Sequence, residues 1–326
     1  MGIKCVGKRK YFTMTEMKAT RQAYGESLVE LGERNRNIVV LDADLAKSTT
    51  TIKFGKRFPD RFFDMGVAEA NMMNTAAGLA TCGKIPFASS FCIFATGRAW
   101  EQIRNTVCSS GLNVKIVATH SGVAVGADGA SHQAIEDIAL MIVIPTMTVI
   151  EPCDAIEAKK AVFAAAEFKG PVYIRMGRAP VPTITTPNTE FKIGKAVILR
   201  EGKDVSLVAC GSLVTNSLKA AEILSGEGIE STVVNMHTLK PIDVETLTRV
   251  AKETGAVVTA EQHALDGGLG SCVAVVLARE YPVPIEMIGI DNRFGQSGEP
   301  EILFKEYHLT AEDIVKAAKK VIKRKK

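Results

Sequence analysis

The sequence lacks the cysteine and leader patterns of secreted and membrane proteins. Its seven cysteines include no C-x-x-C pair and are scattered along the chain: Cys5, Cys82, Cys92, Cys108, Cys153, Cys210 and Cys272. An odd number of cysteines without metal-ligand spacing favours reduced thiols in the cytoplasm. The N-terminus has no signal-type apolar core, and the most apolar run, residues 138–150, is too short to span a bilayer. We therefore expect a soluble, cytoplasmic protein with no membrane partner.

Signature motifs of several large enzyme classes are missing as well. There is no G-x-G-x-x-G, no G-x-x-x-x-G-K-[ST], no G-x-S-x-G and no zinc-spaced cluster of histidines and cysteines. The sequence therefore gives no reason to assign a metal ligand in this chain. The glycine-rich segment DGGLGS, residues 266–271, fits none of these motifs, and we expect it to form a tight turn between a strand and a helix.

Excess positive charge is confined to the C-terminus. The formal net charge is +4, but residues 316–326 hold six lysines and one arginine, so the rest of the chain carries −3. A nucleic-acid-binding protein needs a basic face on its body, so we do not expect nucleic acid as a partner. The basic tail is interpreted as the solvated face of a last helix rather than as an interaction arm.

Short apolar runs alternate with segments of helical spacing through most of the chain. Buried parallel strands are predicted at 37–44, 61–67, 85–91, 113–121, 146–152 and 171–176. Helical spacing is found between them at 69–83, 98–111, 132–143 and 154–170. Further strands are predicted at 204–211, 231–237, 256–263 and 284–290, with helices between them and one at the C-terminus.

The alternation is interrupted at 178–194, where three prolines and little periodicity indicate a linker. The sequence therefore predicts an α/β protein of two open three-layer αβα domains with mainly parallel sheets, at residues 1–185 and 186–326. In such sheets, ligands bind beyond the carboxyl ends of the strands. Polar residues that follow predicted strands are therefore the candidate site residues.

The candidate site residues combine three kinds of chemistry. Glu69 follows one predicted strand, and Phe91 and Phe94 lie at the end of another, so we expect them to gather at one edge of the sheet. A glutamate beside aromatic rings suits a flat heteroaromatic ligand with a protonatable nitrogen. The stretch HSGVAVGADGASHQ, residues 120–133, holds two of the five histidines, one aspartate and three glycines, which suits a hydroxyl-rich substrate. Arginines at 175 and 178 suit a phosphate group.

Together these segments resemble transketolase, a thiamine diphosphate enzyme, over residues 15–305. The resemblance is to its C-terminal half, the pyrimidine-binding domain followed by the C-terminal domain. FFDMGVAEANM resembles the segment with the catalytic glutamate, and IPFASSFCIFATGRAWEQIRN the segment that stacks on the cofactor. THSGVAVGADGASHQAIEDIALM resembles the substrate segment, and LDADLAKST an early strand end. Each segment alone is a weak signal, but the four together are specific.

The resemblance implies how the cofactor is held. Glu69 would bond the aminopyrimidine ring nitrogen of thiamine diphosphate from a largely apolar pocket, where a carboxyl is more easily protonated. The alternative for Glu69 is a carboxylate that interacts with the dipole of its helix. Phe91 and Phe94 would stack on the pyrimidine, or else only pack in the core. The family's third aromatic falls near Gly97, so that contact is either missing or made by another residue. Asp44 would lie on the thiazolium side or cap a turn.

The resemblance also implies how a sugar phosphate is held. Asp128 would bind a hydroxyl group of the ketose, while His120 and His132 would bond hydroxyl groups and relay protons. The phosphate-contacting positions of the family fall on Arg21, Ser48 and Arg178, with Arg175 as the rival of Arg178. Each arginine could instead form a surface ion pair, which stabilises a protein little.

A diphosphate-binding segment, G-D-G followed by an asparagine, is absent from the sequence, since GADG at 126–129 belongs to the substrate segment. We therefore expect this chain to be the C-terminal subunit of a split transketolase. Its partner would be a separate N-terminal subunit that holds the diphosphate through Mg²⁺ or Ca²⁺. The family places the cofactor between protomers, so the resemblance implies an α2β2 assembly with sugar phosphates as substrates, and a chain that is inactive alone.

Three alternatives stay open at this point. The beta subunit of a 2-oxoacid dehydrogenase complex has the same two domains, but phosphate-binding arginines serve no purpose with a simple 2-oxoacid. A 1-deoxyxylulose 5-phosphate synthase shares similar substrate residues, but it usually has a different residue at the position of His120. A non-catalytic regulatory subunit would have no need for Glu69, Asp128 and both histidines together.

Overall fold

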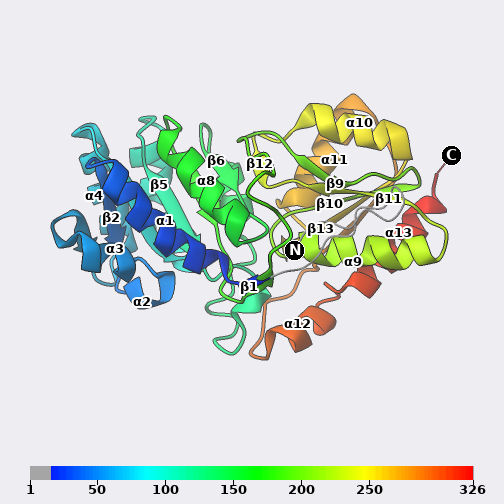
Figure 1. Ribbon diagram of the computed structural model, residues 1–326, viewed down its shortest axis with the longest axis horizontal. Helices are drawn as coiled ribbons and strands as arrows, with labels where there is room; N and C mark the ends of the chain where they lie inside the picture. Colours follow the sequence, from blue (N-terminus) through cyan, green and yellow to red (C-terminus); the bar gives the residue numbers. More distant parts are fainter. Residues whose placement is uncertain (1–15, 326) are drawn as a thin grey trace.

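The structure is a computed structural model that describes residues 16–325, so Cys5 and Lys326 lie outside the described residues. Its strands form two main sheets that lie side by side (Figure 1). The first sheet has seven strands in the order β12-β6-β7-β5-β4-β2-β3. The strands are β2 (Ile38–Asp42), β3 (Phe62–Asp64), β4 (Ile85–Phe91), β5 (Lys115–Thr119), β6 (Thr148–Ile150), β7 (Val172–Arg175) and β12 (Thr238–Lys240). All pairs in it are parallel except β12 with β6.

Helices cover both faces of this sheet. On one face α1 (Thr20–Arg34) and α8 (Ala155–Glu167) pack against the strands, and they cross its front in Figure 1. The other face is covered by α4 (Glu69–Thr81), α7 (Asp137–Ile142) and neighbouring turns. The central strands are buried along their whole length and mainly apolar because helices cover both faces, which is the pattern of a parallel sheet between helices.

The second sheet has five strands in the order β14-β13-β10-β11-β9. They are β9 (Val197–Arg200), β10 (Val205–Ala209), β11 (Ser231–Asn235), β13 (Val257–Ala264) and β14 (Ile285–Ile290), and only β9 is antiparallel to its neighbour. The surrounding helices are α9 (Leu213–Gly226), α10 (Val244–Thr254), α11 (Leu269–Glu280), α12 (Pro300–Glu306) and α13 (Ala311–Ile322). The predicted class, two αβα units with mainly parallel sheets, is therefore confirmed.

The proline-rich segment 178–194 connects the two units and is held by strand pairing and hydrogen bonds. Its strand β8 (Val181–Pro182) pairs with β1 (Met17–Lys18). The buried Asp154 carboxylate accepts hydrogen bonds from the backbone N–H groups of Ile184 and Thr185, at 2.9 and 2.6 Å. The segment is a connection, as expected, but it is ordered by these bonds.

Several elements differ from the sequence expectation. The strand expected at 61–67 shortens to β3 at the edge of the sheet and is partly exposed rather than buried. The helix expected at 132–143 begins only at Asp137, because residues 132–136 are held in a loop. The helix expected at 98–111 divides into α6 (Trp100–Gln102) and a π-helical segment, Ile103–Cys108. Helix α1 and edge strand β9 were not among the predicted elements.

Two smaller expectations are confirmed by the local geometry. The DGGLGS segment is the turn between β13 and α11, and the buried Glu261 carboxylate accepts bonds from the N–H groups of Leu269 and Gly270, at 2.6 and 2.8 Å. The basic tail belongs to α13 and its end, where Lys320 and Arg324 both pair with Glu286.

The described part of the chain contains six cysteines, and all six are free thiols. No helix among these residues is long and apolar enough to cross a membrane. Within residues 16–325, no group of three or more His, Cys, Asp or Glu side chains is arranged to hold a metal ion.

Candidate functional site

Four aromatic side chains meet beyond the carboxyl ends of the central strands. Phe91 ends β4, Phe94 lies in α5 (Cys92–Arg98), His120 follows β5, and His132 lies in the loop that precedes α7. The ring of Phe91 stacks on His120 with centroids 3.7 Å apart and on Phe94 at 5.8 Å. The His132 ring meets Phe94 edge-on at 5.2 Å. We call these four residues the aromatic cluster.

Glu69 lies beside this cluster as the first residue of α4, with 4% of its surface exposed. Its Oε1 accepts a hydrogen bond from Nη1 of Arg98 at 3.0 Å. The Arg98 guanidinium also lies over the ring of Phe94, 4.1 Å from its centroid. The carboxylate is therefore buried as expected, but it faces a half-exposed cation rather than a purely apolar pocket. Gly97 is exposed, so the position of the missing third aromatic is open.

His120 is held as a neutral imidazole. Burial lowers its pKa to about 3, and the positive charges of Arg21, Arg178 and His132 act in the same direction. Its Nδ1 shares a hydrogen bond of 2.8 Å with the hydroxyl group of Thr119. The backbone of His120 is left-handed, with φ of 62°, which turns the ring back onto Phe91. At physiological pH this side chain exchanges hydrogen bonds but carries no charge.

Two arginines, Ser48 and Asp128 gather next to His120. Arg21 donates to the backbone carbonyl groups of Ser48 at 2.5 Å and of Arg178 at 3.3 Å. Arg178 in turn pairs with Asp128 at 3.6 Å, and both side chains are 39% exposed. Burial and the charge of Arg178 lower the pKa of Arg21, so the two cations lie close enough to repel each other. An arrangement of this kind attracts an anion.

Asp44 lies at the end of β2, where its side chain is exposed and its backbone is left-handed, with φ of 61°. The carboxylate that is buried at this strand end belongs to Asp42. It accepts bonds from the hydroxyl groups of Thr49 and Thr51 at 2.7 and 2.8 Å, and burial raises its pKa to about 6. Asp42 therefore shapes the turn that presents Asp44 and Ser48.

The position of Arg175 contradicts its expected role in phosphate binding. Its side chain is 0% exposed, and it pairs with Asp137 at 2.8 Å and with Glu151 at 2.6 Å. Its remaining nitrogen donates to the carbonyl groups of Ala134 and Gln262, both at 3.0 Å. Since every guanidinium nitrogen is engaged inside the protein, Arg175 is a structural residue at the junction of the two units.

Two residues at the site were missed from the sequence. Arg98 belongs to no motif. The one signal in the sequence is that it follows Gly97 in the segment that resembles the cofactor-stacking segment of transketolase. Gln133 ends the substrate segment and has no expected role there, yet it is buried and bonds to backbone carbonyl groups of both units. Its contacts arise from long-range packing, which no local pattern reveals.

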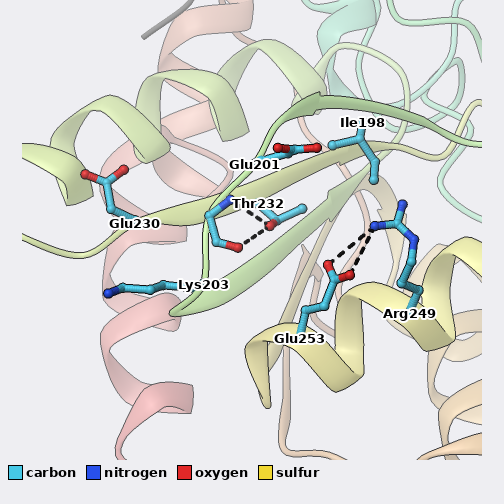
Figure 2. Close-up of a pocket in the computed structure, with 8 residues that line it drawn as sticks. Ile198, Glu201, Lys203, Glu230, Thr232, Arg249 and Glu253 are labelled. Carbon is cyan, nitrogen blue, oxygen red and sulfur yellow. Dashed lines mark hydrogen bonds and ion pairs between the residues drawn. The ribbon is translucent and has the colours of Figure 1, made fainter. Parts of the chain in front are cut away.

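A surface hollow of about 550 Å³ lies on the second unit, away from the aromatic cluster. Figure 2 shows that the ion pair of Arg249 and Glu253 crosses one side of it and that Thr232 bonds to the backbone of its floor. None of the candidate site residues lines it. The lining is Ile198, Glu201, Gly202, Lys203, Glu230, Thr232, Arg249 and Glu253.

A buried carboxylate beside an aromatic platform, at the carboxyl edge of a parallel sheet, is the arrangement expected from the resemblance to a pyrimidine-binding domain. Comparison with known proteins agrees. The transketolase pyrimidine-binding domain matches residues 16–183, and the transketolase C-terminal domain matches residues 194–314. The chain belongs to the transketolase family.

Several relatives are similar over nearly their whole length. A putative transketolase C-terminal section from Methanocaldococcus jannaschii is 51% identical over 92% of this chain and 95% of its own. The 6-deoxy-6-sulfo-D-fructose transketolase subunit SqwH from a Clostridium species is 44% identical over 94% and 95%. A solved split gene transketolase, described as an inactive β4 tetramer, has a TM-score of 0.89 and 55% identity, over 94% of this chain and 99% of that one. Human transketolase is 36% identical, and the match covers 49% of its length.

Proposed function

We propose that this chain is the C-terminal subunit of a split transketolase, which transfers a two-carbon ketol unit between sugar phosphates. The observation that carries the proposal is the joint position of Glu69, the aromatic cluster and the Arg21–Arg178 pair. Glu69 and Phe94 lie at one end of this arrangement, the neutral His120 in the middle and the two cations at the other end. This order matches a heteroaromatic cofactor, a hydroxylated carbon chain and a terminal phosphate.

The residues present fit the pyrimidine ring of thiamine diphosphate. Arg98 already places a planar group with N–H donors against Phe94 and bonds it to Glu69. An aminopyrimidine is also planar and would make the same two contacts once Arg98 turns toward solvent, which its half-exposed side chain permits. Phe91, Phe94 and Glu69 would hold the ring, and Asp44 would approach the thiazolium side. When bound, the cofactor supplies the carbanion chemistry that protein side chains lack.

The other residues of the site would bind the substrate and move protons. Asp128 would accept a hydrogen bond from a hydroxyl group of the ketose, because its pair with Arg178 is exposed and therefore weak. His120 and His132 would bond neighbouring hydroxyl groups, and His120 would do so as a neutral donor or acceptor. Arg21, Ser48 and Arg178 would hold the phosphate, since guanidinium groups bind tetrahedral oxyanions through paired N–H donors.

We further propose that the active enzyme needs a separate N-terminal subunit in an α2β2 assembly. The partner would bind the diphosphate of the cofactor through Mg²⁺ or Ca²⁺, and the complex would work in the cytoplasm. Two relatives that match over 95% of their own length are named as a transketolase C-terminal section and a transketolase subunit, which supports a separate partner chain. The similar solved structure, a split gene transketolase, is an inactive β4 tetramer, which supports the need for a second kind of subunit.

The test is to purify the tagged chain from its native lysate and identify what co-purifies in stoichiometric amount. The expected partner carries the G-D-G…N segment, and the pair transfers a ketol unit when thiamine diphosphate and Mg²⁺ are added. Glu69→Gln should abolish turnover in the same assembly. A partner that gives 2-oxoacid decarboxylation, or a complex that binds no thiamine diphosphate, would overturn the proposal.

A further inference from the structure

The loop that carries Asp128 and His132 is held from the second unit. We call residues 122–133 the substrate loop, and residues 291–299, between β14 and α12, the brace. The backbone N–H of Ala124 donates to Oε1 of Gln262, a residue of β13, at 3.1 Å. The brace contacts the other end of the substrate loop. Residues of the C-terminal unit therefore border the loop at both ends.

Gln133 is the side chain that joins the loop to the brace. It is 2% exposed, and its Nε2 donates to the carbonyl group of Gln296 in the brace at 2.9 Å. The same nitrogen bonds to the carbonyl groups of Val123 and Gly126, at 3.2 and 3.3 Å. One amide thus connects the two turns of the substrate loop with each other and with the second unit.

Glycines in the brace and in the substrate loop indicate that these two segments are closely packed. A Cβ atom at Gly295 of the brace would overlap Oε1 of Gln133, which has no hydrogen-bond partner. On the opposite side, a Cβ at Gly129 would lie 2.6 Å from the Ser297 hydroxyl, and Gly129 is left-handed with φ of 74°. The closeness of the two segments therefore requires glycine at these two positions.

We propose that Gln133 is a positioning residue for the reaction and that the brace is its anchor in the C-terminal unit. This inference rests on the proposed function of the substrate loop. His132 directly precedes Gln133, and Asp128 lies five residues before it in the same loop, so the amide sets where their side chains lie relative to Phe94 and Arg178. The C-terminal unit then contributes to sugar binding without touching the sugar.

Two variants test the proposal from opposite sides. Gln133→Met keeps the size of the side chain but removes its donors, and Gly295→Ala pushes on the same amide from a residue outside the site. Gly226→Ala is the matched control, because a Cβ there meets no atom within 4 Å. Each variant is assembled with the N-terminal subunit, and we measure KM for the ketose, kcat and the Kd for thiamine diphosphate with Mg²⁺.

The expected result is a KM raised about tenfold or more in both variants, with little change in Kd for the cofactor, since Glu69 and Phe91 lie outside the loop. A loss of thermal stability and of cofactor affinity in step with KM would indicate a merely structural role and overturn the proposal. Unchanged KM in Gly295→Ala would overturn it as well.

Hydrogen exchange separates this proposal from the proposed function. In the isolated chain, amides of the substrate loop should exchange faster in Gly295→Ala than in the wild type, while those of Gly226→Ala should not change. Equal exchange in all three proteins would overturn the brace whether or not the assembled enzyme transfers ketol groups. Faster exchange together with an inactive wild-type assembly would leave the brace standing and overturn the function.

Discussion

Replacing Arg98 by alanine is expected to tighten the binding of thiamine diphosphate to the assembled enzyme. In the structure the Arg98 guanidinium bonds to Oε1 of Glu69 at 3.0 Å and covers the ring of Phe94 at 4.1 Å. An aminopyrimidine bonded to Glu69 and stacked on Phe94 needs the same two surfaces. In the proposed complex the arginine and the cofactor would therefore compete, and removal of the arginine should favour the cofactor.

The size of the effect follows from the two contacts. The side chain of Arg98 is 51% exposed, so its ion pair with Glu69 is screened by water and contributes about 0.2–1 kcal/mol. The cation–π contact with Phe94 adds roughly 0.5–1 kcal/mol at an exposed site. Together they give about 0.7–2 kcal/mol, and since about 1.4 kcal/mol is a factor of ten, the Kd should fall about 3- to 30-fold.

Calorimetric titration of thiamine diphosphate with Mg²⁺ into the assembled enzyme measures this Kd directly. Arg104→Ala is the control, because it removes the same charge from a nearby exposed arginine that bonds only to its neighbour Asn105. In a Glu69→Gln background, much of the effect of Arg98→Ala should disappear, since the ion pair is already broken. A Kd that is unchanged or higher in Arg98→Ala would refute the reasoning and make Arg98 a neutral or favourable contact.

Three further predictions concern other parts of the site. Arg175→Met should destabilise the chain by about 3–5 kcal/mol in urea denaturation, because it leaves the carboxylates of Asp137 and Glu151 buried without their cation; a loss below about 1 kcal/mol would contradict this. His120 has its pKa lowered to about 3, so it stays neutral in the folded chain while the unfolded chain takes up a proton below about pH 6.5. The free energy of unfolding should therefore fall as pH falls from about 6.5 toward 3, and it should fall less steeply in His120→Asn. Because His120 stays neutral, the activity of His120→Asn relative to that of the wild type should be constant between about pH 5.5 and 8. Arg178→Ala should raise KM for a ketose phosphate about tenfold or more but leave KM for the unphosphorylated ketose nearly unchanged, as steady-state kinetics with both donors would reveal.

The parts of the fold that could be predicted from the sequence are those with a strong local signal. Continuous apolar runs indicate the central strands, since a parallel strand buried on both faces has no polar side. The loop at 132–136 is predicted as helix because its apolar spacing, with Ala134 and Ile135 buried, imitates a helical face. Those residues are held outside the helix by Gln133 and by the bond from Arg175 to the Ala134 carbonyl group. Such contacts join residues far apart in the chain, so a local pattern does not contain them.

The same distinction explains which candidate site residues lie together in the structure. Glu69, Phe91 and His120 follow strand ends, and strand ends of a parallel sheet converge on one edge, so their meeting could be expected. Arg175 also ends a strand, but it is the last residue of β7, beside the junction with the second unit, and there a cation is enclosed by two carboxylates. In the sequence, Arg175 has the same position relative to its strand as a residue that binds a ligand. Only the burial, which depends on the second unit, distinguishes the two.

The two units of this chain depend on each other more than a proline-rich connection implies. Strand β12, which comes after that connection, completes the edge of the first sheet by pairing with β6 (Figure 1). One apolar core continues from Tyr173 in the first unit to Val208 in the second. Arg175 bonds to the Gln262 carbonyl group, and Gln133 bonds to that of Gln296. Residues 1–185 alone would lack all four of these supports. The substrate loop would then keep its sequence without the contacts that shape it, so the C-terminal unit is needed for the geometry of the candidate site.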